Sequence, residues 1–147
     1  MRAGGAWLAA GGALSMAAAV GHLACIAGGP TWFRAMGAGE RIARMVEEGR
    51  FAPIAVTLAI AGVLAGFAAY AWSGAGLLPR LPLLRVALVA VTAVYLLRGL
   101  VLFAPGALRR PDLSAAFLLW SSAIVLAIGL IHLVGTWRCW PALQGNR

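Results

Sequence analysis

The hydrophobic and polar positions of the chain form four long apolar runs that are separated by short polar segments. Three of these runs, residues 3–33, 51–79 and 113–137, contain no charged residue, and the fourth contains two arginines. A helix that crosses a membrane needs about 20 mostly apolar residues, and each run supplies them. The pattern predicts four transmembrane helices that use residues 1–147 as a single domain. Their predicted positions are about 7–27, 52–72, 83–104 and 114–136.

The apolar runs favour helices over strands, because none of them alternates between apolar and polar residues with the period of a strand. Only helices and closed barrels satisfy their backbone hydrogen bonds inside lipid. We therefore predict an all-α fold, a polytopic membrane protein built as a four-helix transmembrane bundle. An even number of crossings places both termini at one end of the bundle, which we call the termini end. The opposite end is called the loop end.

The segment between the first two predicted helices, residues 31–50, alternates apolar and charged positions and holds three of the four acidic residues. Glu40 and Arg44 are four residues apart, as are Arg44 and Glu48, and opposite charges at this spacing support a helix. The pattern predicts an interfacial amphipathic segment that lies on the membrane surface at the loop end.

The composition agrees with a membrane protein and limits its partners. Hydrophobic residues make up 63% of the chain and charged residues 11%, whereas about a quarter of the residues in soluble domains are charged. The net charge of +8 comes from arginines that are spread over both ends, which argues against nucleic acid and for contact with the lipid bilayer. We expect a multi-pass protein of the plasma (inner) membrane. The arginine counts of the two ends, five at the termini end and six at the loop end, leave both orientations open. We expect cytoplasmic termini, because several arginines of the loop end have acidic neighbours.

Each of the four predicted helices carries a polar residue at a similar depth in the membrane, so these residues form one layer. With a rise of about 1.5 Å per residue, the distance from the middle of each helix gives the depth of a side chain. The polar residues fall roughly 3–7 Å from the midplane toward the loop end, below the segment that carries Glu40. We predict that this layer binds a small anionic or amphipathic molecule. The predicted ligand residues are His22, Thr57, Tyr95, Arg98 and Ser121 in the layer and Glu40 above it.

Arg98 is the least expected residue of this layer, because a permanent cation inside an apolar run is costly. Its planar guanidinium could bind a carboxylate, phosphate or sulfate, with His22 beside it as a donor or acceptor. Two other interpretations stay open for Arg98: a structural ion pair with Glu40, or a long side chain that reaches the headgroups. His22 has the alternative of a hydrogen bond to a neighbouring carbonyl.

The sequence gives no support for catalytic or cofactor chemistry. The two histidines cannot share a haem, because His132 falls roughly 10 Å from the midplane on the termini side and His22 lies on the loop side. No metal-ligand cluster, cofactor motif or arrangement of catalytic residues is found, so we predict no metal and no cofactor and name no reaction.

Two classes of function therefore follow from the sequence. In the first, the protein binds or transports a small anionic or amphipathic molecule in the predicted layer. In the second, it is a structural or accessory subunit, whose glycine-rich helix faces pack against a second copy or a partner membrane subunit. The motif Gly62-x-x-x-Gly66 has the spacing of such close-packing faces. A membrane-embedded enzyme that acts on a lipophilic substrate is the third alternative.

Overall fold

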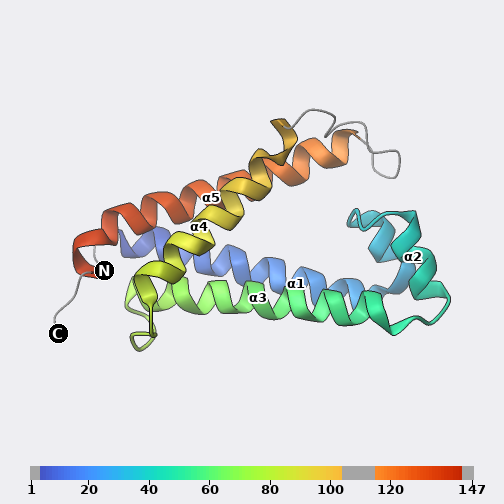
Figure 1. The fold of residues 1–147 in the computed structure, drawn as a ribbon, viewed down its shortest axis with the longest axis horizontal. Coiled ribbons are helices and arrows are strands. Elements are labelled where there is room, and N and C mark those ends of the chain that lie inside the picture. Colours follow the sequence, from blue (N-terminus) through green and yellow to red (C-terminus); the bar gives the residue numbers. More distant parts are fainter. Residues whose placement is uncertain (1–3, 104–114, 144–147) are drawn as a thin grey trace.

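The computed structural model describes residues 4–103 and 115–143, and the regular structure in these two ranges is entirely helical. The elements are α1 (Gly5–Ala35), α2 (Glu40–Glu47), α3 (Phe51–Ala75), α4 (Leu84–Leu100), the short 3₁₀ helix η1 (Val101–Phe103) and α5 (Ala115–Leu143) (Figure 1). The predicted all-α class is confirmed for this part of the chain. The predicted helix ends at residues 104 and 114 lie outside the described residues.

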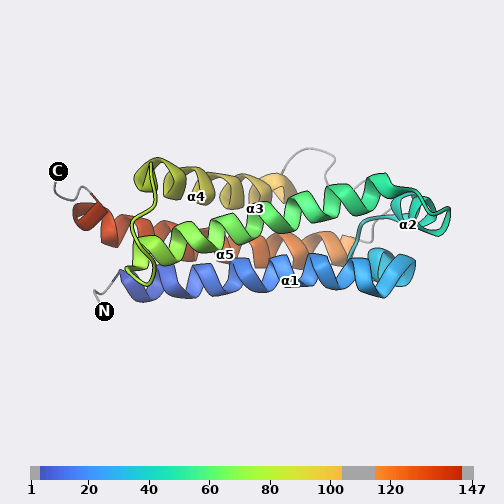
Figure 2. The ribbon, with the colours of Figure 1, turned by 90° about the horizontal axis from the view of Figure 1, so that it is seen from below.

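The four long helices are arranged as two antiparallel pairs, α1 with α3 and α4 with α5 (Figures 1 and 2). Contacts between α1 and α5 join the two pairs. The pairs converge at the termini end, where α1 begins, α5 ends and α3 turns into α4. They diverge toward the loop end, where α2 lies (Figure 1).

Glycines and small side chains let the helices approach one another closely, as expected for helices that pack in lipid. On α1, Gly12 lies beneath the indole of Trp72 on α3, and the indole Nε1 donates a hydrogen bond to the carbonyl oxygen of Ala9 at 3.3 Å. Between α4 and α5, a Cβ atom at Gly99 would lie 2.8 Å from the backbone Cα of Leu126. These contacts fix which face of each apolar helix is buried.

A kink divides α1 at the place where the sequence predicts the first helix to end. Gly29 has φ 66° and ψ −156°, a conformation that glycine adopts without a steric penalty, and Pro30 follows it. The helix then continues to Ala35, which is further than predicted. Beyond it, the apolar side of α2 packs on Phe33 through the buried Ala43 and through Ile42, while its charged side is exposed.

Three helices, α1, α3 and α5, are long and apolar enough to cross a membrane by their length and composition. They indicate a membrane protein. Helix α4 has 17 residues, including Arg85 and Arg98, and does not meet the same criterion. The structure thus supports three of the four predicted membrane spans.

Candidate functional site

Three of the predicted ligand residues use their polar atoms within their own helices. The pairs are His22 Nδ1 with the carbonyl oxygen of Ala18 at 2.8 Å, Thr57 Oγ1 with that of Pro53 at 2.8 Å, and Ser121 Oγ with that of Leu118 at 3.3 Å. The His22 bond corresponds to the alternative that the sequence left open. None of these hydrogen bonds connects two helices.

Arg98 and Glu40, the two charged residues of the predicted layer, lie in separate surroundings. Arg98 is exposed in the last turn of α4, and the described part of the chain gives it no ion pair. Glu40 is exposed at the start of α2, where it binds Arg34 and Arg44. The structure therefore does not join the predicted residues through hydrogen bonds or ion pairs among themselves.

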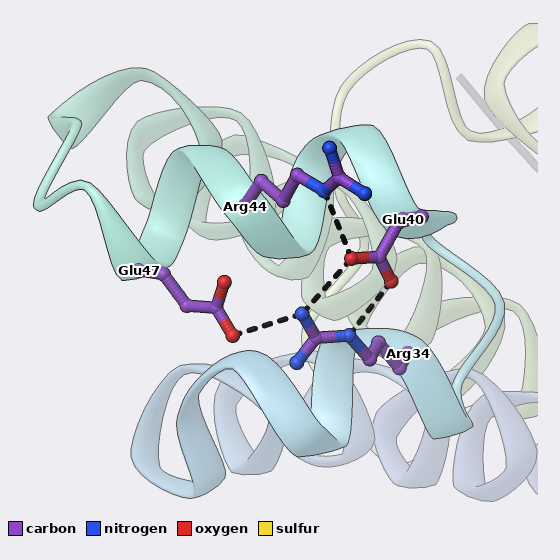
Figure 3. Close-up of polar contacts among 4 residues, drawn as sticks. All are labelled: Arg34, Glu40, Arg44 and Glu47. Carbon is purple, nitrogen blue, oxygen red and sulfur yellow. Dashed lines mark hydrogen bonds and ion pairs between the residues drawn. The ribbon is translucent and has the colours of Figure 1, made fainter.

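Ion pairs connect α2 to the end of α1 (Figure 3). We call this group the clasp; its members are Arg34, Glu40, Arg44 and Glu47. Arg34 donates from Nε to one oxygen of Glu40 at 2.8 Å and from Nη2 to the other at 3.1 Å, and Nη2 also reaches Glu47 at 2.8 Å. Arg44 Nε donates to Glu40 at 3.1 Å. Hydrogen bonds from Arg34 and then Arg44 lower the pKa of Glu40 to about 2. These groups neutralise one another and leave the clasp little capacity to bind a further anion.

Tyr95, the remaining predicted residue, belongs to a buried polar network at the junction of α1, α4 and α5. Its hydroxyl donates to Ser15 Oγ at 2.8 Å, and Ser15 Oγ lies 3.2 Å from Nε2 of His132. The Tyr95 and His132 rings are stacked, with centroids 5.2 Å apart, and the edge of Phe67 meets Tyr95 at 5.7 Å. Ser15 and His132 are fully buried. Gly11 makes room for the network, because a Cβ atom there would lie 3.0 Å from His132 Nε2.

A basic recess lies at the termini end, beside the turn between α3 and α4. We use this name for two adjoining hollows of about 330 and 490 Å³ that share Arg80 and Leu84. Arg85 lines the larger hollow, and its guanidinium carbon lies 4.4 Å from the ring centroid of Trp140. Its Nε atom is buried and has no hydrogen-bond partner in the described part of the chain.

The turn that carries Arg80 is held in place by local hydrogen bonds. Ser73 Oγ donates to the carbonyl oxygen of Pro79 at 2.8 Å and accepts from the amide of Leu81 at 3.0 Å. Arg80 Nη2 donates to the carbonyl oxygen of Leu143 at 2.6 Å, which ties the turn to the end of α5. These hydrogen bonds hold Arg80 where it lines both hollows of the recess.

Electrostatics distinguish the recess from the clasp. The described acidic residues Glu40, Glu47 and Glu48 all lie on α2 or directly after it. The described ranges place no Asp or Glu at the termini end, so no carboxylate side chain among these residues pairs with Arg80 or Arg85. This is the arrangement that an anion would complete, because a charge-assisted hydrogen bond is stronger than one between neutral groups.

Sequence reasoning did not assign functional roles to Ser15, His132, Arg80 or Arg85. The signal for the arginines was present, because they flank the turn at Pro82 and no acidic residue is predicted at that end. The described residues also contain no group of three or more His, Cys, Asp or Glu side chains that could hold a metal ion.

Comparisons with known proteins place the chain in no family. No family model matches the sequence, and neither a curated protein nor a solved structure is similar to it at a significant level.

Proposed function

We propose that the chain is a four-span integral membrane protein that binds an anionic amphipathic molecule in the basic recess at its termini end. The first part of the proposal needs α4 to cross the membrane together with η1. At about 1.5 Å per residue in α4 and about 2.0 Å in η1, the two helices span roughly 31 Å, close to the thickness of the hydrocarbon core. Arg85 and Arg98 lie near opposite ends of α4, from which long side chains can reach the headgroups.

The observation that carries the proposed function is the environment of Arg85. Its guanidinium is held over the Trp140 ring, its Nε donor is buried without a partner among the described residues, and an open hollow lies beside it. A buried donor without an acceptor is costly, so native proteins rarely leave one in this state. A phosphate or carboxylate group in the recess would contact the part of Arg85 that lines the hollow and neutralise its charge.

The apolar surroundings of the recess favour an amphipathic ligand over a free anion. Leu77, Leu78 and Leu83 are large apolar residues that are exposed on the same turn. Leu83 also has φ 54°, a left-handed conformation that is uncommon for residues other than glycine. This exposed apolar rim would contact the alkyl part of a lipid-like molecule while the arginines bind its head.

The same charge pattern supports cytoplasmic termini in a plasma (inner) membrane. Arginines near the ends of transmembrane helices are enriched on the cytoplasmic side. At the loop end, Arg34, Arg44 and Arg50 pair with acidic side chains, whereas Arg80 and Arg85 are not neutralised in this way. Anionic lipids are also concentrated on the cytoplasmic side, where the recess would meet them.

The test compares two arginines of the same helix, Arg85 and Arg98. Protein in neutral detergent is titrated with phosphatidylglycerol and with inorganic phosphate, and binding is followed by native mass spectrometry. Arg85→Gln should weaken lipid binding about 10- to 100-fold, the loss expected when hydrogen bonds to a charged group are removed. Arg98→Gln is the matched control and should bind like the wild type.

Each other result has a defined meaning. Loss of binding in Arg98→Gln with normal binding in Arg85→Gln would move the ligand to the predicted layer at the loop end. Equal binding by the wild type and both variants would refute an anion site on α4. Binding of phosphate as tight as that of lipid would refute the amphipathic part of the proposal.

A second candidate function, that of an accessory subunit, is favoured by one face of α3. Gly62 and Gly66 face open space, with no atom of the described chain within 4 Å of a Cβ atom at either position. Small residues four apart allow another helix to approach closely in lipid. Gly62→Leu should then dissociate a homo-oligomer or a co-purified partner subunit without changing lipid binding. A wild type that is monomeric and purifies alone would refute this candidate.

A further inference from the structure

The two hollows of the basic recess have different walls. The larger hollow is bordered by Arg80, Arg85 and the apolar side chains of the turn before α4. The smaller hollow is bordered by three helix ends, the start of α1 and the ends of α3 and α5, and Arg80 lines it as well. Its volume of about 330 Å³ lies within the range of small-molecule pockets, about 300–1,000 Å³. The recess therefore has room for more than a phosphate group.

The end of α3 supplies hydrogen-bond acceptors to the smaller hollow. Gly76 ends the helix with φ 80°, and the amides of this turn bond only to the carbonyl oxygens of Trp72 and Ser73. The next two residues, Gly74 and Ala75, line the hollow. No residue in the described ranges donates a hydrogen bond to their carbonyl oxygens. These two oxygens remain available to a ligand.

The start of α1 leaves one of these acceptors uncovered. A Cβ atom at Gly5 would lie 3.3 Å from the carbonyl oxygen of Ala75, so a larger residue there would press on this oxygen. The first amides of a helix have no partner within it, and Gly4 provides no side-chain cap for α1. Donors at the start of α1 and acceptors at the end of α3 thus meet at the same hollow.

This mixture of donors and acceptors favours neutral hydroxyl groups over a charged group. An ammonium in the smaller hollow would be repelled by the guanidinium of Arg80. A second anionic group would meet the ends of α3 and α5, where the partial charge of a helix is negative. A hydroxyl both donates and accepts hydrogen bonds, so it can use both kinds of partner.

We propose that the smaller hollow is a subsite for a polyol head group, so that the recess selects phospholipids whose phosphate carries glycerol or a sugar alcohol. The phosphate binds at Arg85 in the larger hollow. The hydroxyls accept hydrogen bonds from Arg80 and donate to the carbonyl oxygens of Gly74 and Ala75. This inference rests on the proposed function, because it requires the phosphate to bind in the recess.

Two lipids of equal charge test the subsite. Phosphatidylglycerol and phosphatidylethanol with identical acyl chains are both phosphodiesters with one negative charge, and only the first has hydroxyls on its head group. The protein in neutral detergent is titrated with each lipid and followed by native mass spectrometry. Phosphatidylglycerol should bind about 10-fold more tightly, as expected for one or two net hydrogen bonds. Equal binding of the two lipids, or tighter binding of phosphatidylethanol, would overturn the polyol subsite.

Ala142→Leu tests where the hydroxyls bind. Ala142 lines the smaller hollow near the end of α5, and leucine would fill part of its volume. Ala93→Leu is the matched control, because Ala93 is an exposed alanine on α4 that lines neither hollow. Ala142→Leu should remove the preference for phosphatidylglycerol, and Ala93→Leu should keep it. An unchanged preference in Ala142→Leu would place the hydroxyls outside the smaller hollow and contradict the proposal.

Arg85→Gln separates failure of the subsite from failure of the proposed function. If the wild type binds both lipids equally and Arg85→Gln weakens both, the anion site stands and the polyol subsite is wrong. If Arg85→Gln binds both lipids like the wild type, the proposed function is wrong and the subsite falls with it. If Ala142→Leu fails to fold, the comparison of the two lipids on the wild type still decides the question.

Discussion

At the scale of single residues, the arginines differ in how much of their hydrogen-bonding capacity the protein uses. Arg34 makes three hydrogen bonds to carboxylates, whereas Arg85 keeps a buried donor without a partner in the described chain. Arg98 is exposed in the last turn of its helix. Because a guanidinium at a helix end can reach the headgroups, this position favours the third interpretation of Arg98 from the sequence.

We predict that Arg98→Leu and Arg98→Lys both change the free energy of unfolding by no more than about 0.5 kcal/mol, as is usual for exposed positions. The double variant Arg98→Leu/Glu40→Gln should be additive, because Glu40 pairs with Arg34 and Arg44. Thermal melts of the three variants and of Glu40→Gln measure these changes in stability and show whether they add. Strong destabilisation by Arg98→Leu that Glu40→Gln rescues would establish the ion pair between them.

At the scale of elements, the helices are held together where glycines let their backbones approach closely. They are not held together by an apolar stripe that is buried away from water. Gly99 of α4 lies directly on the backbone of α5, whereas at Gly21 of α1 no neighbouring atom of the described chain lies within 4 Å of the Cβ position. Both glycines are inside helices, where alanine is intrinsically preferred by about 1 kcal/mol. The effect of a substitution should therefore be set by the neighbouring helix.

Gly99→Ala should destabilise the protein by about 1–3 kcal/mol, because the new methyl group would have to force α4 and α5 apart. Gly21→Ala should be neutral or stabilising by up to about 1 kcal/mol. Unfolding in mixed micelles can compare the two. Equal effects of both substitutions would contradict the close packing of α4 on α5.

The clasp between α1 and α2 has a pH dependence whose sign follows from the pKa of Glu40. This pKa falls from an ordinary value of 4.5 to about 2, mainly through Arg34 and then Arg44. The stabilisation is therefore complete above pH 4.5 and is lost as the pH falls through about 2. Since the groups are exposed, solvent screening keeps the contribution of these ion pairs to the free energy of unfolding small.

The carboxyl ¹³C signal of Glu40, assigned with Glu40→Gln, should titrate with a midpoint near 2. Arg34→Gln should raise this midpoint toward 4.5, because it removes the first cause of the shift. Arg41→Gln is the control, because Arg41 is an exposed neighbour on α2 outside these ion pairs. A midpoint that Arg34→Gln leaves unchanged would show that the clasp does not form in solution.

At the scale of the whole molecule, the two helix pairs give the protein two different ends. The termini end brings the pairs together and carries the basic recess, whereas the loop end separates them and carries the clasp (Figure 1). The proposed fourth span, α4, would place both ends of the chain on one side of the membrane.

We predict that an alkaline phosphatase reporter fused after Arg147 is inactive in cells, because the proposed orientation places the termini in the cytoplasm. The same reporter inserted at Gly49, in the turn between α2 and α3, should be active in the periplasm. Gly49 suits an insertion because it is exposed. The opposite pattern would reverse the orientation, and activity at both sites would show that α4 does not span the membrane.

The sequence by itself determined the secondary structure and the class of the protein. Long uncharged runs indicate membrane helices, and Gly29 and Pro30, where the sequence predicted the first helix to end, are the position of the kink in α1. The charge alternation in residues 31–50 likewise predicted the ion pair of Glu40 with Arg44. These features are local, so neighbouring residues are sufficient to specify them.

Tertiary structure alone decided which polar residues meet. The depth calculation separated His132 from Tyr95, yet their rings are stacked; part of its error is that α5 continues to Leu143, so that the middle of Ala115–Leu143 lies near residue 129. His132 is then only about 4.5 Å from the middle of its helix. The sequence also left the rotation of each helix about its own axis undetermined, since a helix that is apolar all round gives no amphipathic signal of its buried face. Only the glycine contacts between helices fix that rotation, and with it the network of Ser15, Tyr95 and His132.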